Sequence, residues 1–329
     1  MAWETGTASN LDDLLDKMCT FAVAEGGFTE ITQIGSTGRQ SDMYILQRGS
    51  IYWWFLGNIQ VLTNYGNNGF LEMRMMNTQP NLSNRTTLNL GQRYLTKAQL
   101  WNKDDGPFTN YWFYSNGNNC LVVVEVVPNV FTHWCFGVLD KFSTWTGGEF
   151  LAGINMGSPG WNQTSGEWLI GTTAFSSYGS YPFSYDQGNA AAYGAGYLHY
   201  PQDSYGDYRD FALMESTNAD GQSCLSIATY NLENSPPQNN IAGVLGYNSP
   251  NSFNSRTPLL PLWCFVYDTS SARRMILGHV SNMRFLNIEL ITPKETIEVK
   301  WDCYPFFQKD GDNAVATITG KCGYAYERI

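Results

Sequence analysis

The sequence predicts a mainly β protein: an antiparallel β-sandwich of the lectin or jelly-roll-like kind, with a short N-terminal helix and long Gly/Tyr-rich loops. Only 15% of its 329 residues are charged, 15% are aromatic and 32 are glycine, which favours short strands and turns over long helices. Many short apolar runs are separated by Gly, Asn and Asp clusters. Only one segment has a clear helical period.

That helix is predicted to begin after residue 9. Ser9 and Asp12 have the spacing of a capping box. Apolar residues then recur at helical intervals, and four of them are expected to dock the helix on the core: Leu11, Leu14, Leu15 and Met18. Two glycines at 26–27 end the helix, and a strand over 28–34 follows.

Apolar or aromatic runs bounded by turn residues predict the remaining strands. They cover 43–47, 51–56, 59–63, 71–75, 111–115, 121–127, 133–139, 168–171, 211–215, 224–228, 262–268, 275–279, 297–301 and 314–318. Turn clusters at 115–119 and 309–313 predict hairpin loops. Residues 1–40 are predicted to be a helix and strand packed on the core, and residues 41–329 the sandwich. A division of the sandwich near residue 145 stays open.

Residues 156–206 are nearly uncharged, rich in Gly and Ser, and dense in aromatic side chains. Disordered segments are poor in aromatics, so ordered loops are expected here. Tyr and Trp are enriched at protein interfaces and also stack on sugar rings. Three roles for these aromatic side chains stay open, with the most expected first: subunit contact, loop packing within the chain and glycan binding. The candidate residues for contact with a neighbour or a glycan are Tyr178, Tyr181, Tyr185, Tyr193, Tyr197 and Trp161.

The usual signatures of catalysis are absent from the sequence. His133, His199 and His279 lack metal-ligand spacing, and structural, hydrogen-bonded histidines are expected. No serine nucleophile elbow, P-loop or dinucleotide-binding pattern occurs. A glycosidase would need paired carboxylates, for which the candidates are Asp186, Asp203, Asp207 and Asp210. Because Asp is common in turns, these four residues are expected to be solvent-facing turn aspartates. We therefore expect no enzyme, no cofactor and no metal.

Charge and hydropathy argue against two kinds of partner: nucleic acid and the interior of a membrane. The net charge is −10, the sequence pI is about 4.7 and the 19 basic residues are scattered, so no nucleic acid is expected. No apolar run is long enough for membrane insertion, and the first residues lack the features of a secretory signal. The seven cysteines never form a C-x-x-C pair, so buried free thiols are expected, with interchain disulfides as the alternative.

Three blocks of the chain resemble, in the same order, a family of virion structural proteins of tailed bacteriophages. The first is residues 4–17 (ETGTASNLDDLLDK). The second combines 111–117 (YWFYSNG) with the strands at 122–127 (VVVEVV) and 136–138 (FGV). The third covers 292–297 (TPKETI), 304–307 (YPFF) and 324–327 (YAYE). Two departures are Asn118 and Asn119, where a basic residue is expected after the glycine, and the Gly/Tyr-rich segment, which has no counterpart.

This resemblance implies a virion protein made in the cytoplasm of a host bacterium. It implies a homo-oligomer in contact with other virion structural proteins, with the tail or baseplate as the expected place. A receptor-binding module that recognises a host surface glycan is the alternative. A glycan depolymerase is the third reading.

Overall fold

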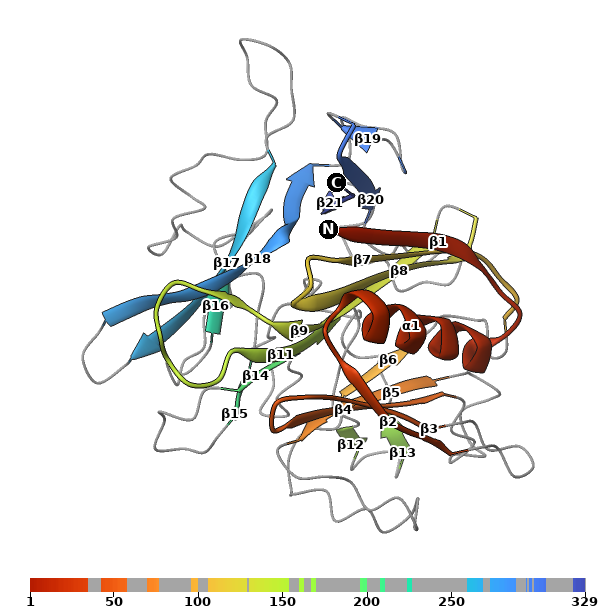
Figure 1. Ribbon diagram of the computed structural model, residues 1–329, viewed down its shortest axis with the longest axis horizontal. Helices are drawn as coiled ribbons and strands as arrows, with labels where there is room; N and C mark the ends of the chain where they lie inside the picture. Colours follow the sequence, from red (N-terminus) through yellow and green to blue (C-terminus); the bar gives the residue numbers. More distant parts are fainter. Residues whose placement is uncertain are drawn as a thin grey trace.

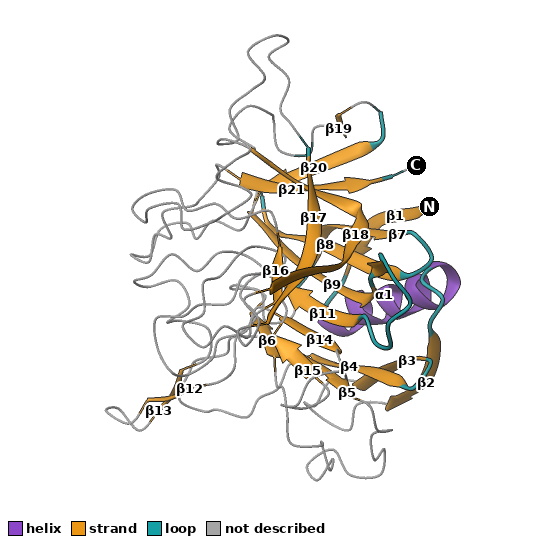
Figure 2. Cartoon of the chain, turned by 90° about the vertical axis from the view of Figure 1, so that its left-hand side faces the viewer, coloured by secondary structure: helices purple, strands orange, loops and turns teal. Residues whose placement is uncertain are grey.

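The computed structural model describes about half of the chain. Those residues are 1–34, 43–57, 70–76, 96–99, 106–128, 130–153, 160–162, 167–169, 196–199, 208–210, 224–226, 259–268, 273–287, 294, 296–297, 299–305 and 322–328. They form antiparallel β-sheets and one helix near the N-terminus, so the mainly β, antiparallel fold class is confirmed (Figures 1 and 2).

Helix α1 (Leu11–Glu25) begins one residue later than the capping box predicts. Asn10, not Ser9, is the N-cap, because its backbone is extended (φ −159°, ψ −177°) and its Oδ1 accepts a hydrogen bond from Asp13 N at 2.8 Å. Asp13, not Asp12, reaches back across the helix start, where its Oδ2 accepts a bond from the backbone N of Ser9, the residue before the cap, at 2.7 Å. The helix ends where Gly26 N donates to Ala22 O, and Gly27 (φ +71°) turns the chain.

Seven of the described strands form one sheet, sheet A, in the order β1-β7-β8-β9-β11-β14-β15. Its strands are β1 (Ala2–Ala8), β7 (Phe108–Ser115), β8 (Asn119–Val127), β9 (Val130–Val138), β11 (Glu149–Gly153), β14 (Gly196–His199) and β15 (Tyr208–Asp210). Strand β1 was not predicted, because its sequence AWETGTA is mostly small and polar and has no clear apolar alternation. Its pairing with β7, from Ala2 opposite Ser115, makes it a strand.

Two further sheets flank sheet A. Sheet B is a meander of β2 (Thr29–Ile34), β3 (Met43–Arg48), β4 (Ile51–Gly57), β5 (Phe70–Met76) and β6 (Thr96–Gln99). Sheet C runs β16 (Cys224–Ser226), β17 (Leu260–Asp268), β18 (Arg273–Asn287), β21 (Cys322–Glu327), β20 (Trp301–Pro305) and β19 (Thr296–Ile297). Strand β10 (Asp140–Lys141) also pairs with β18, and β12 (Gly160–Asn162) pairs with β13 (Glu167–Leu169).

One strand prediction is wrong. Residues 297–301 do not form a continuous strand, because a turn at 299–300 separates β19 from β20 and gives Val299 a positive φ of 64°. Strand β18 is much longer than the predicted 275–279, since it pairs with β17 along one edge and with β10 and then β21 along the other. The predicted strands at 59–63, 211–215 and 314–318 and the turn at 309–313 lie outside the described residues.

One face of sheet A is covered by helix α1 and sheet B. Trp134 of β9 donates its indole N–H to Met18 Sδ at 3.4 Å, which ties the helix to the sheet. Phe28 packs between Trp53 of sheet B and Phe136 of sheet A, with ring centroids 5.2 Å from each. The four residues expected to dock the helix are at most 2% exposed and belong to this core: Leu11, Leu14, Leu15 and Met18.

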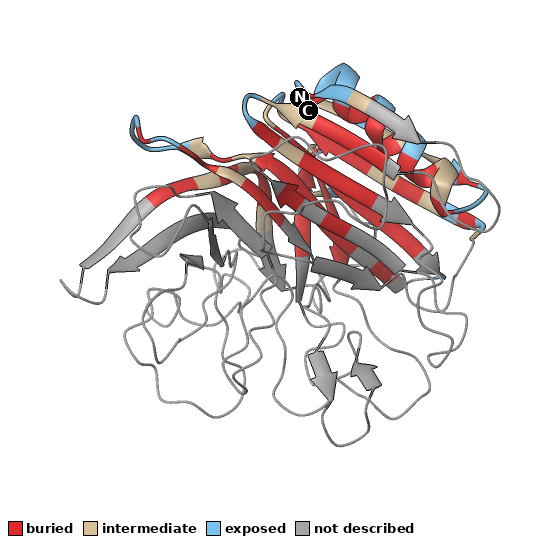
Figure 3. Ribbon diagram, turned by 90° about the horizontal axis from the view of Figure 1, so that it is seen from below, coloured by how far each residue is buried: buried red, intermediate tan, exposed pale blue. Residues whose placement is uncertain are grey.

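The opposite face of sheet A packs on sheet C. Because neighbouring residues of a strand point to opposite faces, His133 and Tyr114 lie on this side while Trp134 and Phe113 lie on the helix side. Tyr326 of β21 stacks on both Tyr114 and His133, at 5.2 and 5.8 Å between ring centroids. Burial on both faces explains the apolar run at 120–124 in β8, and Figure 3 shows buried residues along neighbouring strands.

Candidate functional site

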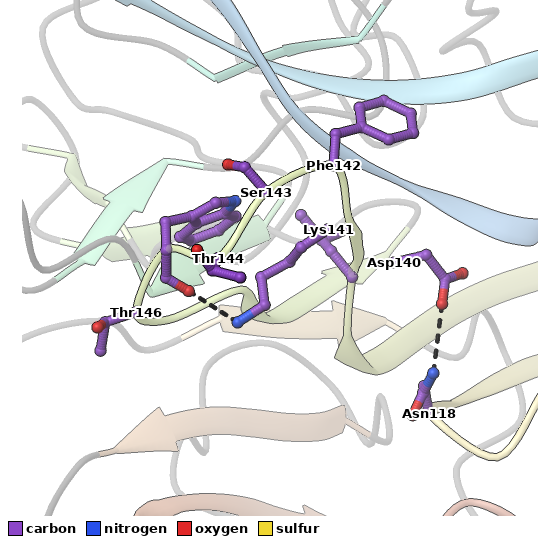
Figure 4. A pocket seen from close by; sticks show the side chains of 9 residues that line it. Asn118, Asp140, Lys141, Phe142, Ser143, Thr144 and Thr146 are labelled. Atoms are coloured by element: carbon purple, nitrogen blue, oxygen red, sulfur yellow. Dashed lines mark hydrogen bonds between the residues drawn. The ribbon is translucent and has the colours of Figure 1, made fainter.

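The segment between β9 and β11 leaves sheet A, pairs with sheet C through β10 and returns to sheet A. Asp140 and Lys141 pair with His279 and Gly278 of β18. On this crossover lies an open hollow of about 790 Å³ (Figure 4). It is lined by Asn118 of the β7–β8 turn and by Leu139, Asp140, Lys141, Phe142, Ser143, Thr144, Trp145 and Thr146.

Hydrogen bonds hold this crossover in one shape. Leu277 O of β18 accepts bonds from Phe142 N and from the indole Nε1 of Trp145, both at 3.1 Å. Lys141 Nζ donates to Trp145 O at 2.8 Å and to Gly147 O at 3.0 Å. It also lies 5.2 Å from the centre of the Trp145 ring. Among the described residues that line the hollow, Lys141 has the only ammonium group, and two of its three N–H groups bond carbonyls of the loop itself.

A carboxylate and an amide form the polar wall of the hollow. Asp140 Oδ1 accepts a hydrogen bond from Asn118 Nδ2, and Asp140 Oδ2 accepts bonds from Asn116 Nδ2 and Ser281 N, each at 3.2 Å. Arg48 Nη2 donates to Asn118 Oδ1 at 2.8 Å and so fixes the amide orientation. The turn that carries these amides is the predicted hairpin loop 115–119, closed by Gly117 at φ +86°.

An exposed aromatic ring stands beside this polar wall. Phe142 is 53% exposed, which is unusual for a phenylalanine, and one face of its ring stacks on His279 at 5.1 Å. Burial lowers the pKa of His279, and Asp140 opposes that shift. In Figure 4 the Phe142 ring and the Asp140 carboxylate lie on one side of the segment, and the Lys141 side chain extends to the other.

A second polar cluster lies in the contact between sheets A and C and is structural. His133 Nδ1 and Tyr326 Oη are 2.6 Å apart, Tyr114 Oη and Tyr304 Oη are 2.8 Å apart, and Tyr114 Oη donates to Asp302 Oδ2 at 3.0 Å. Each of these side chains is at most 5% exposed. Burial, chiefly, raises the pKa of the three tyrosines well above the usual range. The network joins strands of sheet A to strands of sheet C.

Most of the aromatic residues expected at contacts fall outside the described structure: Tyr178, Tyr181, Tyr185 and Tyr193. The backbone of Tyr197 lies in β14 opposite Leu151, and that of Trp161 lies in β12 opposite Trp168. The structure does not describe either side chain. Among the carboxylates considered for a glycosidase, only Asp210, in β15, lies within the described residues.

One histidine, His133, and four cysteines are placed as expected. His133 is a buried, hydrogen-bonded histidine, which confirms that prediction for this residue. Four cysteines are buried free thiols: Cys19, Cys120, Cys135 and Cys303. Burial raises the pKa of the Cys19, Cys120 and Cys135 thiols. These three are therefore neutral and weakly reactive at pH 7.

Sequence reasoning did not single out Asn118, Asp140 or Phe142 as site residues. The one available signal was Phe142 itself, an aromatic residue within the polar stretch 140–146. Within the part of the chain that the structure describes, no group of three His, Cys, Asp or Glu side chains is placed to hold a metal ion. Among the same residues, no helix has both the length and the apolar character needed to cross a bilayer.

The described residues thus form a mainly β protein of antiparallel sheets, with an open, polar hollow where the chain passes from one sheet to another. No protein-family model matches the chain, and no curated protein matches it.

Proposed function

We propose that this chain is a structural component of a tailed-bacteriophage particle, in the tail or baseplate, that acts through contacts with further copies of itself and with other virion proteins. The observation that carries the proposal is the edge of sheet A. Among the described strands, β1 pairs only with β7. An edge strand with an unpaired side offers backbone hydrogen-bonding groups to another chain.

The side chains of β1 fit such a contact. Residues Trp3, Thr5 and Thr7 alternate on one face and are exposed, with Trp3 at 43%. Arg328 lies 5.1 Å above the Trp3 ring, which fixes the ring beside the C-terminal strand. The only charged side chain on β1 is Glu4, and it accepts a hydrogen bond from Tyr111 Oη at 2.8 Å. Strand β1 thus carries no lysine or proline to discourage pairing.

We also propose how the sheets are layered. Sheets A and C would form the two layers of an antiparallel β-sandwich of lectin or jelly-roll-like type, with sheet B and α1 as an added layer. The stacking of Tyr326 on Tyr114 and His133 supports this packing. No residue is assigned a catalytic role in this proposal.

Incorporation into particles tests the function. Particles purified from the source bacterium, analysed by mass spectrometry and cryo-electron microscopy, are expected to contain the chain in a fixed stoichiometry. The variant Trp3→Glu places a charge on the β1 face and is expected to reduce incorporation. Val299→Glu is the matched control, because Val299 is 71% exposed and lies on a turn of sheet C. A chain absent from purified particles would disprove the proposal.

A further inference from the structure

We propose that the hollow at the β10 crossover binds a neutral sugar, with Asp140 and Asn118 bonding its hydroxyl groups and Phe142 covering one face of its ring. This inference does not rest on a place in a phage particle, because it follows from the chemistry of the hollow alone. The hollow is open to solvent, so a ligand there would be held from one side by the residues that line it.

Asp140 and Asn118 offer an acceptor and a donor side by side. The Asp140 carboxylate accepts three described side-chain and backbone hydrogen bonds, all at 3.2 Å, and a carboxylate has about four acceptor positions. The Asn118 amide uses one N–H on Asp140 and its oxygen on Arg48 Nη2, which leaves a second N–H. Two adjacent hydroxyl groups match such a pair, since each can donate and accept.

These two groups are held in place before any ligand arrives. Asn118 N also donates to Asn116 Oδ1 at 2.9 Å, and Arg48 further donates to Gly117 O at 2.9 Å and Gly26 O at 2.7 Å. The guanidinium group therefore ties the hairpin turn to the end of helix α1. Such preorganisation lowers the ordering cost of binding.

Phe142 supplies an exposed apolar platform among the residues that line the hollow. It lies in the bend that follows strand β10, and in Figure 4 its ring and the Asp140 carboxylate lie on the same side of the segment. One ring face is occupied by His279, and 53% of the side chain remains exposed. An exposed aromatic face beside a fixed carboxylate–amide pair suits the C–H face of a sugar.

The charges of the hollow give an anion no net attraction. Asp140 is negative, and it balances the positive charge of Lys141, whose Nζ donates to the carbonyls of Trp145 and Gly147 and lies over the Trp145 ring. The remaining polar side chains on the rim are neutral hydroxyls: Ser143, Thr144 and Thr146. A neutral, polyhydroxylated ligand is therefore favoured over an acidic sugar. A protein segment is less well matched, because Phe142 is the only large exposed apolar side chain among the lining residues.

Saturation-transfer NMR on the full chain tests the proposal. The probes are the neutral sugars glucose, galactose, mannose, rhamnose and N-acetylglucosamine, with glucuronic acid and N-acetylneuraminic acid as acidic comparators. At least one neutral sugar is expected to receive saturation, and neither acid is. For that sugar, Phe142→Ala and Asp140→Asn are each expected to raise Kd about tenfold or more. The control Val299→Ala removes an exposed apolar side chain elsewhere and is expected to leave Kd unchanged.

Three results would overturn the assignment. The first is no saturation of any neutral sugar by the wild-type chain. The second is a Kd for Phe142→Ala equal to that of Val299→Ala while circular dichroism shows both to be folded. The third is Phe142-dependent self-association in sedimentation experiments without sugar binding, which would make the hollow a protein contact. Particle incorporation is measured separately, so failure of the sugar site leaves the proposed function standing, and the reverse also holds.

Discussion

The Nδ1 atom of His133 and the hydroxyl oxygen of Tyr326 lie 2.6 Å apart in the contact between sheets A and C. The two residues are 193 positions apart in the chain, and both are fully buried. Their rings also stack, at 5.8 Å and 19°. A polar pair of this kind sets the register of two facing sheets, because any shift would leave both groups buried without the partner.

Tyr326→Phe keeps the ring and removes the hydroxyl group. It is expected to lower the free energy of unfolding by about 1–3 kcal/mol, because His133 Nδ1 loses this partner in the core. Urea denaturation followed by fluorescence measures the change. Tyr52→Phe is the control, since the Tyr52 hydroxyl accepts a bond from Gln47 Nε2 in a partly exposed place, and about 0.5 kcal/mol or less is expected there. Equal effects in both variants would argue against the interior pair as a stabilising contact.

Leu14→Ala tests the docking of helix α1. Leu14 is 0% exposed within the core, so its truncation is expected to cost about 2–5 kcal/mol through lost burial and a new cavity. Val23→Ala removes a side chain that is 40% exposed on the same helix and is expected to change stability by about 0.5 kcal/mol or less. Thermal and urea unfolding of the two variants should separate clearly. A Leu14 variant as stable as the Val23 variant would mean that the helix does not pack on the sheets as described.

Asn10→Ala tests the observed helix start. Loss of the bond from Asp13 N to Asn10 Oδ1 is expected to destabilise the protein by about 0.5–2 kcal/mol. Thr20→Ala, at an exposed position of the same helix, serves as the control and is expected to be neutral or slightly stabilising. If Asn10→Ala behaved like Thr20→Ala, Asn10 would not be the cap.

The buried thiols are expected to resist modification in the native state. At pH 8, Cys19, Cys120 and Cys135 remain protonated because burial raises the pKa of each thiol, and Cys303 is buried as well. Iodoacetamide labelling followed by peptide mass spectrometry should show these four cysteines labelled only after unfolding in guanidinium chloride. Native labelling of any of them, at a rate independent of unfolding, would contradict the described packing.

Stability is expected to fall at alkaline pH. Tyr114, Tyr304 and Tyr326 have pKa values raised above the ordinary value of 10.0, chiefly by burial. A raised folded-state pKa gives stabilisation that is complete below the unfolded-state pKa and is lost as pH rises above it. The free energy of unfolding should therefore decline above pH about 10, by about 1.4 kcal/mol per pH unit for each buried tyrosine. Urea denaturation midpoints between pH 8 and 11 measure this decline. Tyr326→Phe should make the fall of stability with pH shallower. An unchanged pH dependence in that variant would exclude Tyr326 as a contributor.

Local patterns in the sequence correctly predicted those elements whose structure depends on near neighbours. The helical spacing of Leu11, Leu14, Leu15 and Met18 predicted the buried stripe of α1, and the turn residues at 115–119 predicted the β7–β8 hairpin. The apolar character of β8 likewise followed from its residues, although burial on both faces became clear only with sheets packed on either side.

The candidate site could not be predicted in this way. Asn118 and Asp140 are 22 residues apart, and Ser281 and Arg48 reach the same cluster from sheets C and B. Nothing in the short stretch around Phe142 indicates that the chain leaves sheet A after β9 and forms β10, which pairs with β18 of sheet C. The tyrosines that composition suggested as contact residues, except Tyr197, lie outside the described residues, so that prediction stays untested.

By itself the sequence determined the antiparallel β class, the N-terminal helix with its buried face, the burial of the described thiols and the absence of catalytic motifs. Only the tertiary structure decided that residues 2–8 form an edge strand, that β18 pairs with three strands, and that an exposed phenylalanine stands beside a fixed carboxylate and amide. The physical reason is the range of the interactions. Helix periodicity and turn conformation depend on residues a few positions apart, whereas strand pairing and the meeting of polar groups depend on which distant segments share a face or an edge.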